Sequence, residues 1–252
     1  MRIFLKLKSL ENAAQNSISK YTIQGMLYSS LIDSEFYKLH DQKGFKFFTF
    51  SDLFPSGDFI KGGIKNLIIS SPNDELIRSW HGYFKSNKYI YLSNLPMEIA
   101  EVRKFETEPS QNYESGSPIV LYRNKYENKY LSFKRGDNLQ YFLFRLKDNA
   151  LKKFNAYYED QYFFEEPIFN RLILKKEIVI PNGIKISNAG HSSRNQSLIV
   201  GTVWYELGRD YIERDERKFY KFIMDCGLGE KNSLGFGFIN PKLRWIHDSR
   251  NI

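Results

Sequence analysis

Four histidines are the residues of this sequence best suited to transfer protons near neutral pH, because the pKa of imidazole lies close to 7. They are His40, His81, His191 and His247. His40 ends a short helix predicted over residues 35–40, and a helix C-terminus favours the protonated imidazole that a general acid needs. We expect His81 at a surface helix end, His191 in a polar loop and His247 near the end of the chain. His40 is therefore the first candidate for acid–base chemistry.

Metal and disulfide chemistry find little support in the sequence. A single cysteine, Cys226, excludes an internal disulfide and a Cys-Cys metal-ligand pair. The acidic residues and histidines show no spacing typical of a metal site, and no Ser-His-Asp arrangement has a supporting context. We expect a reducing compartment, no metal and no cofactor.

A glycine-rich segment near the C-terminus is the second feature that could do chemistry. It has two Gly-apolar-Gly triplets on either side of Lys231 and Asn232, formed by Gly227, Gly229, Gly235 and Gly237. Exposed N–H groups of such loops bind anions, and the lysine adds a positive charge. The pattern fits neither a P-loop nor a dinucleotide fingerprint. A tight helix-to-strand connection is the alternative, but two triplets around a lysine favour binding to a sugar–phosphate chain.

Composition agrees with a polyanionic partner. The 252 residues include 37 basic and 29 acidic ones, a net charge of +8, and 16% are aromatic. Aromatic side chains fill cores, and they also offer flat faces on which unpaired bases stack. No apolar run is long enough to span a membrane or to serve as a signal peptide, so we expect a cytoplasmic protein that does not bind membranes.

The elements that must position these residues form two successive groups. Alternation of Ile3, Leu5 and Leu7 with polar residues indicates a first strand, and a helix, two strands, a helix and a strand follow. The six predicted ranges are 2–8, 12–32, 45–50, 59–71, 72–84 and 88–95. Residues 106–118, which contain two prolines, glycine and little apolar content, are the predicted linker.

The same order returns more faintly in the second half. Its predicted ranges are 119–123, 138–158, 177–187, 198–206, 212–226 and 236–239, with a hairpin-like addition between Tyr122 and Asn138. The order strand, helix, strand, strand, helix, strand is that of a ferredoxin-like unit. We therefore predict an α+β protein of two tandem ferredoxin-like (βαββαβ) domains, residues 1–110 with the catalytic site and residues 111–252 with the glycine-rich loop.

The glycine-rich segment resembles the C-terminal signature of the CRISPR-associated repeat-RNA-processing endoribonucleases of the RAMP superfamily. That signature is Gly-apolar-Gly, five residues including a basic one, and Gly-apolar-Gly, and residues 227–237 match every position. Tyr28, Leu39-His40 and residues 44–51 are similar to the family's segment between the first helix and the second strand. The resemblance also implies two ferredoxin-like domains.

The resemblance implies a metal-independent endoribonuclease that cuts CRISPR repeat RNA within precursor transcripts. The RNA's own 2′-hydroxyl attacks the adjacent phosphate and leaves a 2′,3′-cyclic phosphate and a 5′-hydroxyl, which requires a base, an acid and positive charge. His40 would be catalytic with help from Tyr28 and Lys46, while Tyr37 and Lys43 remain alternatives. The RNA-binding residues would be Gly227, Gly229, Lys231, Asn232, Gly235 and Gly237.

The expected partner is CRISPR repeat RNA, and subunits of a CRISPR effector complex and a homodimer are left open. The alternative function is a non-catalytic RNA-binding RAMP subunit of such a complex. The glycine-rich loop is common to both classes, but His40 in its Leu-His and Gly-Phe-Lys context favours the nuclease. A small-molecule-binding protein would leave the basic excess and the Lys231 loop unexplained.

Overall fold

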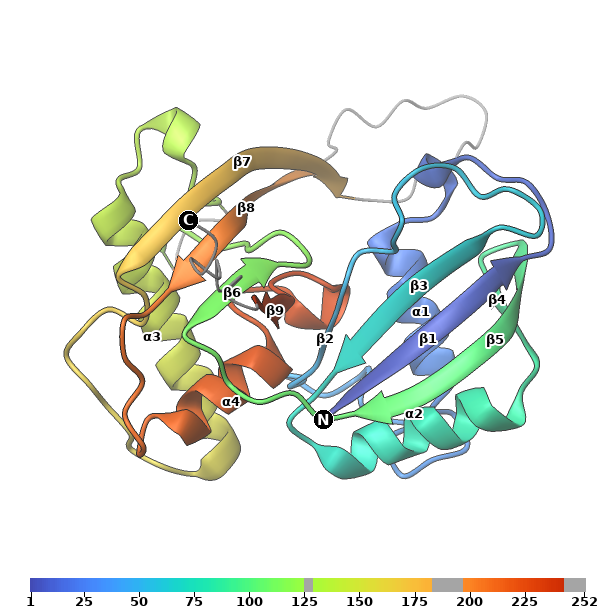
Figure 1. The fold of residues 1–252 in the computed structure, drawn as a ribbon, viewed down its shortest axis with the longest axis horizontal. Coiled ribbons are helices and arrows are strands. Elements are labelled where there is room, and N and C mark those ends of the chain that lie inside the picture. The colour runs from blue at the N-terminus through green and yellow to red at the C-terminus, as the bar shows by residue number, and fades with distance from the viewer. Residues whose placement is uncertain (125–128, 183–196, 243–252) are drawn as a thin grey trace, which may run out of the picture.

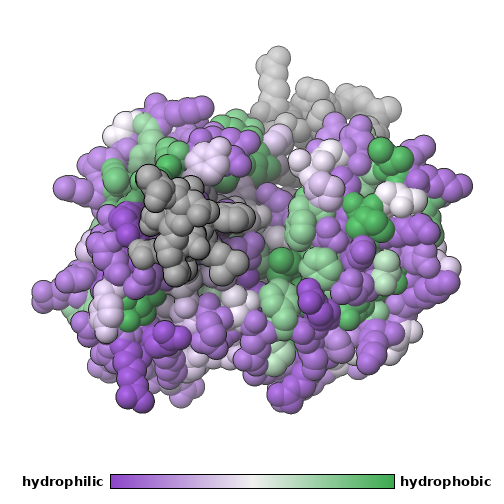
Figure 2. Space-filling model, in the orientation of Figure 1, coloured by the Kyte–Doolittle hydropathy of each residue, from purple (hydrophilic) through white to green (hydrophobic). Residues whose placement is uncertain are grey.

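Two antiparallel sheets stand side by side in the computed structural model, which describes residues 1–124, 129–182 and 197–242 (Figure 1). The first half of the chain forms one sheet and the second half forms the other. Figure 2 shows the same face as mainly hydrophilic, with hydrophobic side chains gathered over the N-terminal sheet. In the described part of the chain, no helix is both long enough and apolar enough to cross a bilayer.

The N-terminal sheet has the strand order β2-β3-β1-β5-β4. Its strands are β1 (Arg2–Ser9), β2 (Thr49–Phe50), β3 (Ile64–Ser70), β4 (Tyr89–Leu92) and β5 (Leu95–Phe105). The helices are α1 (Lys20–Ser29) and α2 (Asp74–Ser86), and the short 3-10 helix η1 (Gln15–Ser17) precedes α1. Every second residue of β1 is fully buried beneath these helices, as the alternation predicted.

The C-terminal sheet has the order β7-β8-β6-β9. Its elements are β6 (Asn112–Ser115), α3 (Leu139–Tyr158), β7 (Arg171–Asn182), β8 (Ser197–Gly208), α4 (Arg217–Cys226) and β9 (Ile239–Pro241). The 3-10 helices are η2 (Phe133–Arg135) and η3 (Asn232–Leu234). β1 lies between β3 and β5, just as β6 lies between β8 and β9, and β4 is an added edge strand of the first sheet. The predicted α+β fold of two ferredoxin-like domains is confirmed.

The segment before the predicted site differs from the sequence-based expectation. The helix predicted over residues 12–32 is shorter, because Ser19 and Thr22 form a capping box that starts α1 at Lys20. The helix predicted over residues 35–40 is wrong, because successive hydrogen bonds to the residue three positions back make a series of turns there. His40 therefore does not lie at a helix C-terminus.

The strand predicted over residues 45–50 is also shorter. Phe47 has a φ of 51°, which an extended strand cannot hold, so β2 begins only at Thr49. This backbone conformation directs the ring of Phe47 to the C-terminal domain, where it packs against Tyr157 and Phe222.

Two strands were missed, β5, whose second residue is Pro96, and β6, which is only four residues long. β5 follows β4 through a turn with Ser93 at a φ of 57°, and β5 is the strand that pairs with β1. β6 lies inside the predicted linker, whereas residues 119–123 contribute only isolated bridges. The first sheet ends at Phe105 and the second begins at Asn112, with the predicted division after Ser110 between them.

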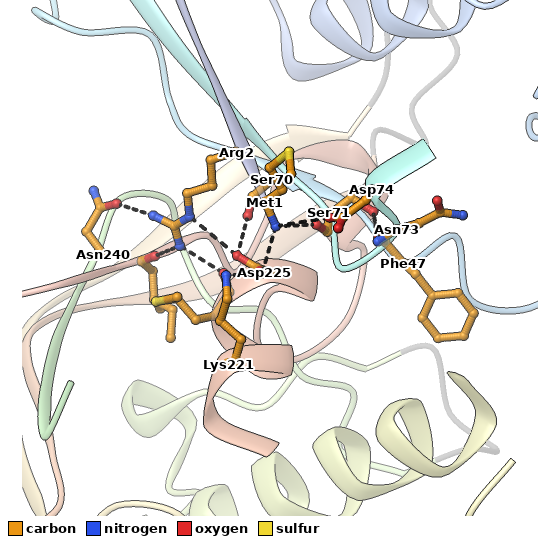
Figure 3. A network of polar contacts seen from close by, with 12 residues as sticks. Met1, Arg2, Phe47, Ser70, Ser71, Asn73, Asp74, Lys221, Asp225 and Asn240 are labelled. Carbon is orange, nitrogen blue, oxygen red and sulfur yellow. Dashed lines mark hydrogen bonds and ion pairs between the residues drawn. The ribbon is translucent and has the colours of Figure 1, made fainter. Parts of the chain in front are cut away.

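A buried polar network joins the two domains (Figure 3). The guanidinium of Arg2, on β1, is 1% exposed and donates to the backbone oxygens of Met224 and Ile239 at 2.9 and 2.7 Å. It also donates to Asn240 at 2.8 Å and lies 3.8 Å from the carboxylate of Asp225. Burial lowers the pKa of Arg2 to about 10. The first strand is thus fixed to α4 and β9, which sets the orientation of the domains.

Candidate active site

His40 lies on the turns between α1 and β2 and presents its ring to solvent. Its side chain is 69% exposed, while its neighbour Leu39 is buried and anchors the turn. The Nδ1 atom lies 3.0 Å from a carboxylate oxygen of Asp41, and this contact leaves Nε2 for a substrate. The His40 ring meets the ring of Tyr28 edge to face, with centroids 5.0 Å apart. Asp41 was not anticipated from the sequence.

Tyr28, in the last turn of α1, connects His40 to the other domain. Its ring is half-buried and also contacts Phe48, with centroids 5.9 Å apart. Burial raises the pKa of the Tyr28 hydroxyl above its usual value, and a side-chain hydrogen bond with Ser233 partly opposes this shift. The hydroxyl therefore stays neutral at physiological pH and can donate a hydrogen bond. By contrast, Tyr37 is 57% exposed and its ring contacts Lys38.

Lys46 holds the turn that carries His40. Its ammonium donates to the backbone oxygens of Leu39 at 2.6 Å and His40 at 3.1 Å, and also to that of Gln42. These three contacts occupy all three N–H donors of a lysine. Burial lowers the pKa of Lys46, an effect that Asp41 opposes. The charge is thus directed at carbonyl oxygens of the turn, that of His40 included.

The four predicted glycines of the loop are buried, and protein atoms surround them. Each has a positive φ, between 69° and 89°. A side chain would collide with the backbone oxygen of Leu228 at Gly237, with that of Val120 at Gly229 and with the Phe50 ring at Gly235. The glycines thus allow the loop to pack closely against the rest of the protein.

A buried lysine braces this loop from inside. The ammonium of Lys153, on α3, donates to the backbone oxygens of Gly227 and Gly229 at 2.6 and 3.0 Å and to Oδ1 of Asn232 at 2.7 Å. The side-chain nitrogen Nδ2 of Asn232 donates to the backbone oxygens of Leu228 and Phe236, both at 3.0 Å. The structure thus places the Asn232 side chain inside the loop. Sequence reasoning missed Lys153, although its position on the apolar stripe of a helix was a usable signal.

The loop meets the N-terminal domain along α1. Gln24 donates to the backbone oxygen of Ser233 at 2.9 Å, and Lys20 donates to that of Gly235 at 2.7 Å. A cavity of about 320 Å³ lies between residues 44–47 and residues 229–233 and has Lys46, Lys153 and Lys231 in its lining. The ammonium of Lys231 lies 5.7 Å from the centre of the Tyr122 ring. The lining also includes Phe45, Phe47 and one carboxylate, that of Glu230, so the cavity combines a net positive charge with aromatic side chains, which suits a nucleotide.

Of the other three histidines, the structure describes only His81. His81 lies on α2, and burial is the largest cause of its lowered pKa. His191 and His247 lie outside the described residues. Within residues 1–124, 129–182 and 197–242, no group of three or more His, Cys, Asp or Glu side chains is placed to hold a metal ion.

Comparison with known proteins confirms the resemblance seen in the sequence. A family model described as CRISPR associated protein Cas6, C-terminal, matches residues 101–241. The CRISPR-associated endoribonuclease Cas6 2 of Methanocaldococcus jannaschii is 44% identical over 248 residues, which cover 96% of this chain and 99% of that protein.

Solved structures agree with the fold. A Cas6-related protein from Pyrococcus furiosus superposes with a TM-score of 0.70 at 23% identity, over 97% of this chain and 99% of that one. A structure described as an RAMP protein binding different RNA substrates has a TM-score of 0.62 at 21% identity and covers 96% and 100% of the two chains.

Proposed function

The chain belongs to the Cas6 family of CRISPR-associated proteins, and from this premise we propose that it is an endoribonuclease that cuts CRISPR repeat RNA within precursor transcripts. The observation that carries the proposal is the contact of His40 with Tyr28 on α1, the helix that also holds the glycine-rich loop through the hydrogen bond from Gln24 to Ser233. It joins an exposed acid–base group to a loop that bears a lysine, across the boundary between the two domains. A relative described as an endoribonuclease and a structural neighbour described as binding RNA support the same activity.

The proposed reaction is metal-independent. The 2′-hydroxyl of the RNA loses its proton and its oxygen bonds to the adjacent phosphorus, the bond from phosphorus to the 5′-oxygen breaks, and that oxygen gains a proton. The products are a 2′,3′-cyclic phosphate and a 5′-hydroxyl. His40 transfers a proton in this scheme, since its imidazole is accessible to a bound substrate. Tyr28 donates a hydrogen bond, and Lys46 supplies positive charge and orders the turn.

RNA binding is proposed at the cavity beside the glycine-rich loop, with Lys231 as the phosphate contact. Gly227, Gly229, Gly235 and Gly237 permit the loop's close packing, and Asn232 and Lys153 keep its shape. Effector-complex subunits and a second copy of the chain are the next partners to test, by copurification and by solution mass. We propose that the protein acts in the cytoplasm.

The test is incubation of purified protein with end-labelled repeat RNA in excess EDTA, followed by mapping of the product ends. We expect cleavage at one position, with a cyclic phosphate on the upstream fragment. A 2′-deoxy nucleotide directly upstream of the cut is the matched control, and it should abolish cleavage while it preserves binding. A strict magnesium requirement would contradict the mechanism, and binding without cleavage would favour the non-catalytic subunit.

A further inference from the structure

A second concavity lies beside the candidate active site, between α1 and the edge strand β4. It has a volume of about 600 Å³, within the range of small-molecule sites, and four tyrosines line it: Tyr21, Tyr83, Tyr89 and Tyr91. We call it the tyrosine groove. Tyr89 and Tyr91 are 49% and 64% exposed. Their rings are thus available for contact with another molecule.

The helix leaves one side of the tyrosine groove open. Tyr21, Gly25 and Ser29 follow one another at intervals of four residues on α1 and line it together. A side chain at Gly25 would meet nothing within 4 Å, so packing does not require glycine there. Glycine within a helix costs about 1 kcal/mol relative to alanine. The position therefore keeps an open space beside the tyrosines at a cost in helix stability.

The tyrosine groove lies on the row of α1 residues next to the row that contains Tyr28. Ser29 lines it and directly follows Tyr28, whose ring contacts His40. On the neighbouring row of α1, Gln24 holds Ser233 of the glycine-rich loop. The groove and the tyrosine that contacts His40 thus lie on adjacent rows of one helix.

Aromatic rings also connect Tyr21 of the tyrosine groove with the glycine-rich loop. Tyr21 and Tyr130 both pack against the small cluster that contains Leu234. Tyr130 stacks on Tyr122 with centroids 4.9 Å apart, and the Tyr122 ring in turn contacts Lys231. Rings thus extend from the loop to the groove.

The described residues that line the tyrosine groove are uncharged and rich in aromatic rings, which suits the flat faces of bases rather than a basic partner. Beside it, the ammonium of Lys88 lies 5.4 Å from the centre of the Tyr89 ring and forms an ion pair with Glu98 at 3.6 Å. We propose that the tyrosine groove is a stacking site for unpaired nucleotides of the repeat RNA next to the cut. This inference rests on the proposed function. Every base has a flat face, so such a site holds the strand without selecting its sequence.

Two variants test the groove by different routes. Tyr91→Ala removes an exposed ring, and Gly25→Leu fills the open space while it favours the helix. Each should weaken binding of single-stranded repeat RNA by roughly 5- to 150-fold, the range for loss of one stacked base. The slope of log affinity against log salt should stay unchanged, because no phosphate contact is lost. Tyr91→Phe should restore binding, and Tyr211→Ala, at a 67% exposed tyrosine of the other domain, should have no effect.

The outcome also separates this inference from the proposed function. Wild-type protein should quench 2-aminopurine placed beside the cut site, and the two variants should not. If both variants bind RNA with wild-type affinity and quench 2-aminopurine normally, the proposed stacking site is wrong, and the proposed nuclease activity is unaffected. If the protein binds RNA tightly, this binding depends on Tyr91 and no RNA is cleaved, the proposed nuclease activity is wrong and the proposed stacking site stands. A wild-type protein with no affinity for repeat RNA would overturn both.

Discussion

The rings of Tyr28 and His40 meet at 90° with their centroids 5.0 Å apart, and this contact couples the candidate catalytic group to the C-terminal domain. Tyr28 is anchored on α1, the helix whose Gln24 donates to the backbone oxygen of Ser233, whereas His40 lies on exposed turns. An exposed imidazole loses rotational freedom when an aromatic edge packs against it. Tyr28 therefore restricts the orientation of His40 as well as offering a hydroxyl of its own.

Tyr28→Phe separates these two roles, because it keeps the ring and removes the hydroxyl. We expect single-turnover cleavage to slow by about tenfold or more if the hydroxyl acts in the reaction. The free energy of unfolding should fall by only about 1 kcal/mol, the value of one hydrogen bond. Tyr37→Phe, at an exposed position, should cut at the wild-type rate. Unimpaired cleavage by Tyr28→Phe would assign Tyr28 to packing alone.

Lys46→Met should slow cleavage by roughly 10- to 100-fold without weakening RNA binding, since a loosened turn misplaces His40 by the small distances to which catalysis is sensitive. Hydrogen exchange of residues 39–42 should accelerate in the variant. Lys43→Met is the matched control on the exposed side of the turn. A salt-dependence slope reduced by about 0.7 would instead show that Lys46 contacts a phosphate.

Lys153→Met should lower the free energy of unfolding by about 3 kcal/mol, because it leaves buried carbonyl oxygens without donors. Burial lowers the pKa of Lys153, so the unfolded chain binds more protons between that lowered pKa and the usual value of 10.5. In that pH interval Lys153 therefore makes the free energy of unfolding rise with pH. In Lys153→Met this part of the pH dependence should be absent.

Urea denaturation at several alkaline pH values measures both effects of the Lys153 substitution. The control is Lys152→Met, whose lysine is 64% exposed and forms a surface ion pair with Asp148. It should cost no more than about 1 kcal/mol. Equal destabilisation by the two substitutions would show that Lys153 does not brace the loop.

Lys231→Ala should weaken RNA binding and reduce the slope of log affinity against log salt by about 0.7, the effect of one lost phosphate contact on a single strand. The ammonium borders the cavity beside the loop, so it is placed for such a contact. Filter binding at four or more salt concentrations measures the slope. Lys218→Ala, at an exposed lysine of α4, should leave it unchanged. An unaltered slope in Lys231→Ala would make the loop purely structural.

Local signals in the sequence were sufficient for the class of fold. Alternation in β1 marked a strand, and helices were predicted where α2 and α3 form, because their patterns lie close in sequence. The order of elements then led to the ferredoxin-like domains. The grouping of His40 with Tyr28 and Lys46 was predicted from a family resemblance. The structure brings the three residues together.

What the sequence did not reveal depends on contacts between distant segments. β6 is four residues long and is stabilised by pairing with β8 and β9. No local sequence pattern indicates this pairing. Phe47 leaves the extended conformation to pack on the other domain. Asn232 was predicted to bind RNA from its place in a loop, whereas its hydrogen bonds lie within the protein because Lys153 approaches from α3.

The most direct measurement of the central claim is single-turnover cleavage of repeat RNA by His40→Ala, with affinity measured on the same RNA. If His40 transfers a proton in the transition state, the rate should fall by roughly 10²–10⁴-fold. Affinity should stay within about twofold of the wild type, because an exposed imidazole adds little to a surface that binds through phosphate contacts. His81→Ala should cut normally. A folded His40→Ala protein that cleaves at the wild-type rate would contradict the assignment of His40.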